Sequence, residues 1–459
     1  MGKIKDKSIN LNKAMILTIL GLAWPTMLEQ LMQTVVQYID TAMVGTLGTQ
    51  ATAAVGATST VNWLIGSTIS AVSVGFLSFI ARALGANDGA IVKRAVAQAV
   101  LAVLVVGSVF TAITLILSDI IPVWMQVDKS IQALASKYFF ILYVPMLFRT
   151  ASIIFGTILR AAGDTKTPMK IGVLVNVINV VLNFLLIYET RMINIFGVHI
   201  NMPGAGLGVI GAAVASAIAF VVGGICITVV LWRHPLVSPK GQCFKPDIDI
   251  LRPCMVVAFP NMLQRFGTSL GYVFFASMIN SIGEVATAAH TIANTVESAF
   301  YIPGYGMQTA AATLAGNAYG AKDKRKMKEL SAMFIPIEVI LMIISGGCLF
   351  VFAPYLLGIF STNEEVIRLG TTVLRMVAIS EPFYGFSIII EGMMQGIGKT
   401  KEPFVFNIVG MWGIRIVGTF ICTQILHMGL VSAWACMIAH NLLLFVLFLL
   451  HRKSIDVAV

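Results

Sequence analysis

A stripe of polar side chains follows one face of a long apolar segment near the N-terminus. Four residues spaced i, i+3, i+7 and i+10 fall on one side of a helix: Gln30, Gln33, Gln37 and Asp40. An ionisable side chain in hydrocarbon costs about 2.5–3.5 kcal/mol or more, so a carboxylate there is a functional candidate. Burial away from water favours the neutral form of a carboxyl group, whereas its ionised form attracts cations. The chemistry that we expect of Asp40 is reversible binding of a proton or a small cation.

A second polar face is predicted in the apolar segment 167–188. Its three asparagines are spaced i, i+3 and i+7: Asn176, Asn179 and Asn183. Side-chain amides donate hydrogen bonds to carboxylates, so we predict one proton- or cation-coupling site that contains Asp40 and these asparagines. The sequence leaves open the alternative that the asparagines only join neighbouring helices through interhelical hydrogen bonds.

Polar residues also interrupt the apolar segments of the second half of the chain. We predict that six polar residues from the two halves line a substrate cavity: Gln33, Gln37, Gln264, Asn294, Glu297 and Glu381. Four arginines also lie inside apolar segments: Arg149, Arg265, Arg375 and Arg415. The sequence leaves open whether these arginines neutralise glutamates or extend to a membrane interface.

The composition is that of a membrane protein. Hydrophobic residues make up 58% of the 459 residues and charged residues only 11%, whereas a soluble domain carries about 25% charged residues. Twelve apolar segments are long enough to cross a bilayer as helices. They lie near 14–45, 50–80, 90–118, 130–158, 167–188, 205–232, 250–281, 285–316, 327–353, 365–396, 403–426 and 428–450. We therefore predict an all-α integral membrane protein with twelve transmembrane helices.

The chain repeats itself at a constant offset of 235 residues. Matching pairs include Pro25 with Pro260, Gly48 with Gly283, and Gly163 with Gly398. Each half holds six predicted spans, so the two halves enter the membrane with the same orientation and form a parallel repeat. We predict two pseudo-symmetric six-helix bundles, 1–233 and 250–459, joined by a cytoplasmic linker at 234–249. The repeat register breaks only at a predicted outer loop, 189–204.

The basic residues indicate the orientation of these spans. Outside the spans, nearly all lysines and arginines fall in alternate connecting segments, which the positive-inside rule assigns to the cytoplasm. We expect a multi-pass protein of the cell (plasma) inner membrane with both termini in the cytoplasm. A net charge of +10 could indicate nucleic acid as a partner, but dispersed basic residues do not form the clustered face that nucleic acid requires.

No catalytic or metal-binding pattern is found. The six cysteines lack metal-ligand spacing, and no nucleophile–base set occurs at membrane depth. We expect neither an enzyme nor a resident cofactor or metal.

Pro25 and Pro260 occupy equivalent places in the first span of each half. A proline inside a helix removes one backbone hydrogen bond and permits a bend. We expect each to act as a hinge, although a static kink has the same sequence signature.

The repeated motifs resemble the MATE (multidrug and toxic compound extrusion) transporters over essentially the whole chain. They comprise Pro25 with Leu28 and Gln30, Asp40-Thr41-x-Met43-Val44-Gly45-x-Leu47-Gly48, and the segments 81–86, 159–168 and 206–213. The resemblance implies twelve helices in two bundles and secondary active efflux driven by H⁺ or Na⁺. The resemblance is greater to the DinF-like branch of the family than to the NorM-like branch. In the DinF-like branch, an Asp on the first helix is a protonation site.

The resemblance also implies roles for particular residues of this sequence. It implies that Asp40 is the protonation site and that Asn179 supports its carboxylate. Some relatives have a second Asp where this chain has Asn183. The NorM-like branch has an acid on the seventh helix, where this chain has Gln264, which favours H⁺ over Na⁺.

We therefore expect a multidrug efflux antiporter of the cell membrane that exports organic cations and confers drug resistance. Its partners would be small-molecule drugs and the lipid bilayer, and we expect a monomer. The alternative transport function is export of a lipid-linked precursor, as in the related flippases. A passive channel would not require carboxylates placed differently in the two halves.

Overall fold

The computed structural model of the chain describes residues 2–124, 127–195 and 198–458, and nearly all of them are helical. The elements up to the linker are α1 (Gly2–Gly45), α2 (Thr49–Gly85), α3 (Gly89–Ile116), α4 (Ile121–Trp124), α5 (Lys129–Tyr143), α6 (Met146–Ala161), α7 (Lys166–Leu186), β1 (Glu189–Ile195), β2 (Val198–Ala205) and α8 (Val209–Arg233). Those that follow are α9 (Ile248–Asn280), α10 (Glu284–Gly320), α11 (Lys324–Phe360), α12 (Glu364–Ile397), α13 (Lys401–Ile408), the π-helix η1 (Val409–Ile416), α14 (Val417–Phe420), the π-helix η2 (Ile421–Ile425) and α15 (Leu430–Ala458).

Most of these helices are long and apolar enough to cross a membrane. Within the described residues nine meet this standard, or ten if α5 and α6, which meet at 49°, form one bent span. The helices α9 and α10 are 33 and 37 residues long, and they account for the two remaining segments predicted as spans. The predicted all-α membrane fold is therefore confirmed.

The chain divides into two compact units. The N-unit comprises Leu31–Phe76 and Gly89–Arg252. The C-unit comprises the residues up to Gln30, Leu77–Asp88, and the residues from Pro253 onward. The C-unit thus contains the start of α1 and the end of α2 in addition to the helices of the second half. The boundaries expected from the sequence, at 233 and 250, stay a prediction.

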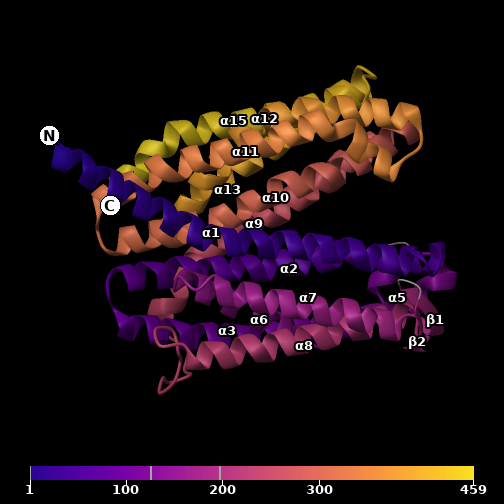
Figure 1. The fold of residues 1–459 in the computed structure, drawn as a ribbon, viewed down its shortest axis with the longest axis horizontal. Helices are drawn as coiled ribbons and strands as arrows, with labels where there is room; N and C mark the ends of the chain where they lie inside the picture. Colours follow the sequence, from indigo (N-terminus) through magenta and orange to yellow (C-terminus); the bar gives the residue numbers. More distant parts are fainter. Residues whose placement is uncertain (1, 125–126, 196–197, 459) are drawn as a thin grey trace. The chain divides into compact units, whose positions relative to one another are not determined.

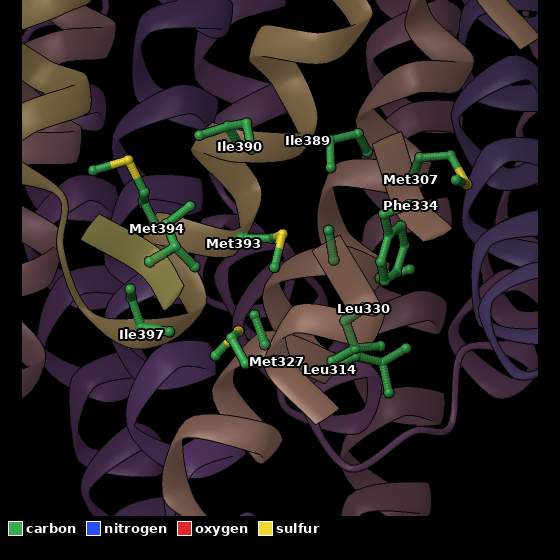
Figure 2. Packing of buried hydrophobic residues seen from close by; sticks show 14 of the residues in the cluster. Met307, Leu314, Met327, Leu330, Phe334, Ile389, Ile390, Met393, Met394 and Ile397 are labelled. Carbon is green, nitrogen blue, oxygen red and sulfur yellow. The ribbon is translucent and has the colours of Figure 1, made fainter. Parts of the chain in front are cut away.

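The core of the C-unit is built from α10, α11 and α12, which run alongside one another together with α15 (Figure 1). Figure 2 shows Met307 of α10 beside Phe334 of α11, with Ile389 and Met393 of α12 in the same cluster. All four side chains are at most 1% exposed. Burial of each large apolar side chain stabilises the fold by about 1.5–3 kcal/mol, so this cluster stabilises the packing of the three helices.

The internal repeat is visible in the backbone of the turns. Three pairs of residues at the 235-residue offset share the left-handed region of φ. The pairs are Gly48 and Gly283 (φ 108° and 146°), Asn87 and Lys322 (φ 56° and 53°), and Gly163 and Gly398 (φ 85° and 87°). Residues with a side chain rarely adopt this region, so the same turns have been kept in both halves.

The same symmetry appears where α2 and α10 meet within the C-unit. A Cβ atom added at Gly85 would collide with the backbone of Asn317, and one added at Gly320 would collide with the backbone of Arg82. The 235-residue offset relates Gly85 to Gly320 and Arg82 to Asn317, so the two contacts are equivalent in the repeat. The helices approach so closely because both contact positions lack a side chain.

The predicted outer loop at 189–204 is instead a β-hairpin at one end of α7 and α8 (Figure 1). Strands β1 and β2 are antiparallel, with Met192 opposite Asn201. Apolar and polar residues alternate over 193–195 and 198–202, which is the pattern of a strand pair. The segment was predicted as an outer loop between two spans, and the strands within it were not predicted because the alternation is short and is followed by the turn residues Pro203 and Gly204.

The linker after α8 is fastened to α3 inside the N-unit. The side chain of Gln98, only 2% exposed, donates to the Lys245 carbonyl at 2.8 Å and accepts from the Asp247 backbone N–H at 2.9 Å. Arg94 forms an ion pair with Asp247 at 2.5 Å. The amide of Gln98 thus satisfies the carbonyl of Lys245 and the backbone N–H of Asp247, which lie in a segment without regular secondary structure.

Candidate functional site

Asp40 meets an asparagine of α7 inside the N-unit. It lies on α1 and is partly exposed, whereas Asn183 is only 1% exposed. The side-chain Nδ2 of Asn183 donates to Asp40 Oδ1 at 2.6 Å. Hydrogen bonds to an ionised acceptor are shorter and stronger than neutral ones, so this contact favours the carboxylate form of Asp40.

Asn179 extends the same network by one helical turn. Turned about its Cβ–Cγ bond, its amide donates to the two carboxylate oxygens of Asp40 at 2.9 and 3.1 Å and accepts from the Ser216 hydroxyl at 3.0 Å. We assign this orientation because a carboxylate only accepts hydrogen bonds. In this orientation, Asn179 and Asn183 of α7 both donate to Asp40, and Ser216 of α8 donates to Asn179. Ser216 was not predicted from the sequence, since a lone serine in an apolar helix carries no signal.

The other predicted residues of the first half do not join this network. Gln33 and Gln37 are exposed on α1, and Asn176 is partly exposed on α7. None of the three forms a side-chain hydrogen bond with Asp40 in the described part of the chain. The helical spacing therefore placed them on roughly the correct face, but only two of the asparagines reach the carboxylate.

A half-buried arginine lies elsewhere in the N-unit, with no carboxylate partner among the described residues. The guanidinium of Arg149 on α6 donates to Asn62 Oδ1, which also accepts from the Tyr143 hydroxyl at 3.0 Å. It also lies over the ring of Phe220, at 5.1 Å from the centroid. Among the described residues, the positive charge is stabilised by neutral groups only.

The predicted polar residues of the C-unit fall into two groups. In the first, Gln264 of α9 donates to Glu391 Oε1 at 2.8 Å. Gln395 and Asn407 donate to the same carboxylate at 3.2 and 3.4 Å. Arg265 bonds Asn261 instead, at 3.0 Å. Gln264 is thus a ligand of a glutamate that was not among the predicted site residues.

In the second group, Glu297 and Glu381 are in electrostatic contact with Tyr301, which belongs to a cluster of three tyrosines. Glu297 of α10 and Glu381 of α12 are 5% and 2% exposed. The hydroxyls of Tyr305 and Tyr384 lie 3.0 Å apart, and the ring of Tyr301 packs edge-on against both rings at 5.9 Å. Asn294 is exposed on α10. This group could bind a cation or an aromatic ring.

Arg415 lies in the π-helix η1 and is in electrostatic contact with Glu297 of this second group. Its guanidinium stacks over the rings of Tyr272 and Phe275, at 4.8 and 4.6 Å. π-helical turns are rare and often occur at functional sites. Sequence analysis expected an uninterrupted span here, because a π-turn leaves no mark in apolar periodicity.

The two predicted hinges lie inside continuous helices. Pro25 is within α1 and Pro260 is within α9, and both are buried. A Cβ atom added at Gly306 of α10 would lie 2.6 Å from the backbone nitrogen of Met27. The turn of α1 that follows Pro25 is therefore in close contact with α10 in this structure. Whether either proline acts as a hinge stays a prediction.

The chain matches known proteins along most of its length. The MatE family profile matches twice, over residues 25–185 and 260–421. The two matches begin at Pro25 and Pro260, one of the pairs that define the internal repeat. The probable multidrug resistance protein NorM of Thermotoga maritima is 28% identical over 428 residues, which cover 92% of this chain and 88% of that protein.

Solved structures show the same fold. An outward-facing multidrug resistance MATE family transporter of the MOP superfamily has a TM-score of 0.88 at 25% identity, over 96% of each chain. A MATE protein in the bent conformation has a TM-score of 0.86 at 25% identity, over 96% of this chain and 95% of that one. The family expected from the motifs is confirmed, while the DinF-like branch stays a prediction. With both halves matched by the family profile and the fold shared throughout, the chain belongs to the MATE family of membrane transporters.

Proposed function

We propose that the protein is a secondary active multidrug antiporter that exports cationic, amphipathic compounds in exchange for H⁺. The observation that supports this most is the environment of Asp40. Its carboxylate accepts hydrogen bonds from neutral amides, and no ion pair neutralises it in the described part of the chain. Its charge is therefore available to a proton or to a cationic substrate, which would compete for it.

The competition gives a coupling mechanism. Ionised Asp40 attracts a cationic substrate and keeps the hydrogen bonds from Asn179 and Asn183. Protonation from outside removes the charge, weakens these bonds and releases both the substrate and α1, which can then bend at Pro25. When the cavity faces the cytoplasm, the proton leaves. One charge that moves down a membrane potential supplies about 2.3 kcal/mol per 100 mV.

The C-unit would supply further substrate contacts. We propose Gln264, Asn294, Glu297 and Glu381 as the polar part of its lining, with the nearby tyrosine rings as its aromatic part. Aromatic rings and acids together suit flat organic cations of varied shape. Methionine contributes an adaptable apolar surface, and the chain contains 23 methionines.

The orientation in the membrane follows from the distribution of basic residues. We propose that the protein lies in the inner membrane with both termini in the cytoplasm, and that it works as a monomer. The start of α1 and the end of α15 lie at the same end of the C-unit (Figure 1), as two termini on one side of a membrane require.

The test is transport by the purified protein in liposomes. A fluorescent organic cation is followed under an imposed pH gradient and, separately, under an imposed Na⁺ gradient of the same size. Cation movement driven by the pH gradient alone supports the proposal. Movement driven only by Na⁺ contradicts H⁺ coupling, and movement under neither gradient redirects attention to lipid-linked precursors as substrates.

A further inference from the structure

A fully buried carboxylic acid lies on α11, outside both polar groups described above. Glu338 is 0% exposed, and neither of its carboxylate oxygens has a hydrogen-bond partner. It follows the Phe334 of the Figure 2 core by one helical turn. An ionised carboxylate without partners in an apolar interior is so unfavourable that such a group takes up a proton instead. Glu338 is therefore neutral in this structure.

The protein leaves room for this side chain on two neighbouring helices. A Cβ atom at Gly304 of α10 would lie 2.8 Å from Glu338 Oε1, and one at Gly385 of α12 would lie 3.2 Å from Glu338 Cγ. Met342 closes the same space, since its Cε and Cγ atoms would lie 2.6 Å from those two Cβ atoms. The carboxyl group thus occupies a small pocket at the junction of α10, α11 and α12.

Each of the three helices is weakened near this pocket by a proline. Pro303 precedes Gly304, Pro336 is two residues before Glu338, and Pro382 precedes the turn that contains Gly385. Each proline removes one backbone hydrogen bond from its helix. Local opening that admits water and protons is therefore easiest at this level of the three helices.

The titratable groups around the pocket are mostly acids. Glu381 of α12 lies one turn before Gly385, and its Oε2 atom is also unpartnered. Glu381 is in electrostatic contact with Glu338 and with Glu297 of α10, and Arg415 is the cation that acts on Glu297. Tyr301 of α10 is in electrostatic contact with Glu297 and Glu381, and its ring packs against those of Tyr305 and Tyr384. Like charges in a medium of low dielectric constant repel one another, so the acids cannot all be ionised together.

We propose that Glu338, with Glu381 as its acidic neighbour, forms a second proton-binding site, in the C-unit and on α11, that exchanges its proton during the transport cycle. The site goes beyond the coupling assigned to Asp40 and does not depend on it. Ionisation of Glu338 requires the pocket to open to water. The helices would open where Pro303, Pro336 and Pro382 have each removed a backbone hydrogen bond. The proton of Glu338 is therefore released only in a conformation other than the one described here.

The test is infrared difference spectroscopy of the purified protein between mildly acidic and alkaline buffer, which detects the C=O stretch of protonated carboxylic acids. The Asp40→Asn protein, in which the first site cannot contribute, is expected to keep a band that disappears at alkaline pH. Adding Glu338→Gln is expected to remove that band. The matched control is Glu391→Gln, because three amides already stabilise the Glu391 carboxylate and its loss should leave the band unchanged.

Two results would overturn the proposal. One is a titrating band that persists in Glu338→Gln; the other is a Glu338 band that no pH removes, as expected of a permanently neutral structural group. Counting protons per exported cation in liposomes gives an independent readout, in which Glu338→Gln is expected to move one proton fewer than the wild type. An unchanged proton count in Glu338→Gln contradicts the second site even if that variant is less stable. Loss of all pH-driven transport in Asp40→Asn concerns the first site and leaves the second untouched.

Discussion

The Nδ2 atom of Asn183 lies 2.6 Å from Oδ1 of Asp40, although 143 positions separate the two residues in the chain. A short hydrogen bond from a buried amide selects the ionised form of the carboxyl group. Asn183 therefore sets how readily Asp40 takes up a proton, and the proposed exchange of proton for substrate depends on this balance.

Replacement of Asn183 by alanine should make Asp40 easier to protonate. A hydrogen bond to a charged group contributes about 1.5–3 kcal/mol, and one pH unit corresponds to about 1.4 kcal/mol. The pH at which binding of a fluorescent organic cation is half lost should thus rise by about one to two units. The measurement is fluorescence anisotropy of the bound cation across a pH series.

Asn176→Ala on the same helix is the control, because Asn176 forms no hydrogen bond with Asp40 in the described residues. Its pH midpoint should equal that of the wild type. Equal midpoints for Asn183→Ala and the wild type would show that the amide does not tune the carboxylate.

The reciprocal contact between α2 and α10 predicts that neither Gly85 nor Gly320 tolerates a side chain. In Gly320→Ala the new Cβ collides with the backbone of Arg82, and overpacking of this kind costs about 1–3 kcal/mol or more. We expect a clear fall in the apparent Tm in detergent. Gly347→Ala is the matched control, since nothing lies within 4 Å of a Cβ there, and its Tm should stay the same or rise. Similar Tm values for the two variants would contradict the close approach.

The attachment of the linker to α3 predicts protection from proteolysis. Gln98→Ala removes both hydrogen bonds to the linker backbone at Lys245 and Asp247. Trypsin should then cut faster after Lys240, a linker lysine that is not followed by proline, which can be followed by mass spectrometry of the fragments. Lys93→Ala, which leaves those bonds intact, should show the wild-type rate. No acceleration in Gln98→Ala would mean that other contacts hold the linker.

The start of α5 predicts a pH-dependent contribution to stability. The Asp128 carboxylate accepts from the Ser130 backbone N–H at 2.8 Å and from its hydroxyl at 2.7 Å, and the backbone hydrogen bond lowers the pKa of Asp128 below its ordinary value. A lowered pKa means that the contribution is complete above the ordinary value of an aspartate and is lost as the pH falls through the lowered one.

Asp128→Asn keeps a capping oxygen but has no such titration. Its apparent Tm should therefore be lower than that of the wild type at neutral pH, and the difference should shrink in acid. A difference that stays constant across the pH range would contradict this role for the carboxylate.

Helical periodicity predicted a polar face that contains Asp40 and another that contains Asn179 and Asn183, but it did not separate these two asparagines from Asn176, which does not reach Asp40 in the described residues. Each helix has few polar residues, their spacing defines one face, and a carboxylate in hydrocarbon needs donors. The repeat and the spans were equally accessible, because the 235-residue offset and the long apolar segments are properties of the sequence itself.

The partners within the C-unit could not be predicted in the same way. Gln264 bonds Glu391, 127 positions away, but the second half offers several polar residues on several helices, and periodicity does not select one pair among them. The pocket of Glu338 is formed by glycines on two other helices, and a glycine in an apolar span looks the same whether or not it makes room for a neighbour. The π-helical turn that carries Arg415 leaves no trace in the pattern of apolar residues.

The most direct test of the central claim is cation export from liposomes under a pH gradient, for the wild type and Asp40→Asn side by side. Asparagine keeps the size of the side chain but can neither ionise nor exchange a proton. We predict pH-driven export by the wild type and its loss in Asp40→Asn, with both proteins folded to the same apparent Tm. Undiminished pH-driven export by Asp40→Asn would contradict the assignment of proton coupling to Asp40.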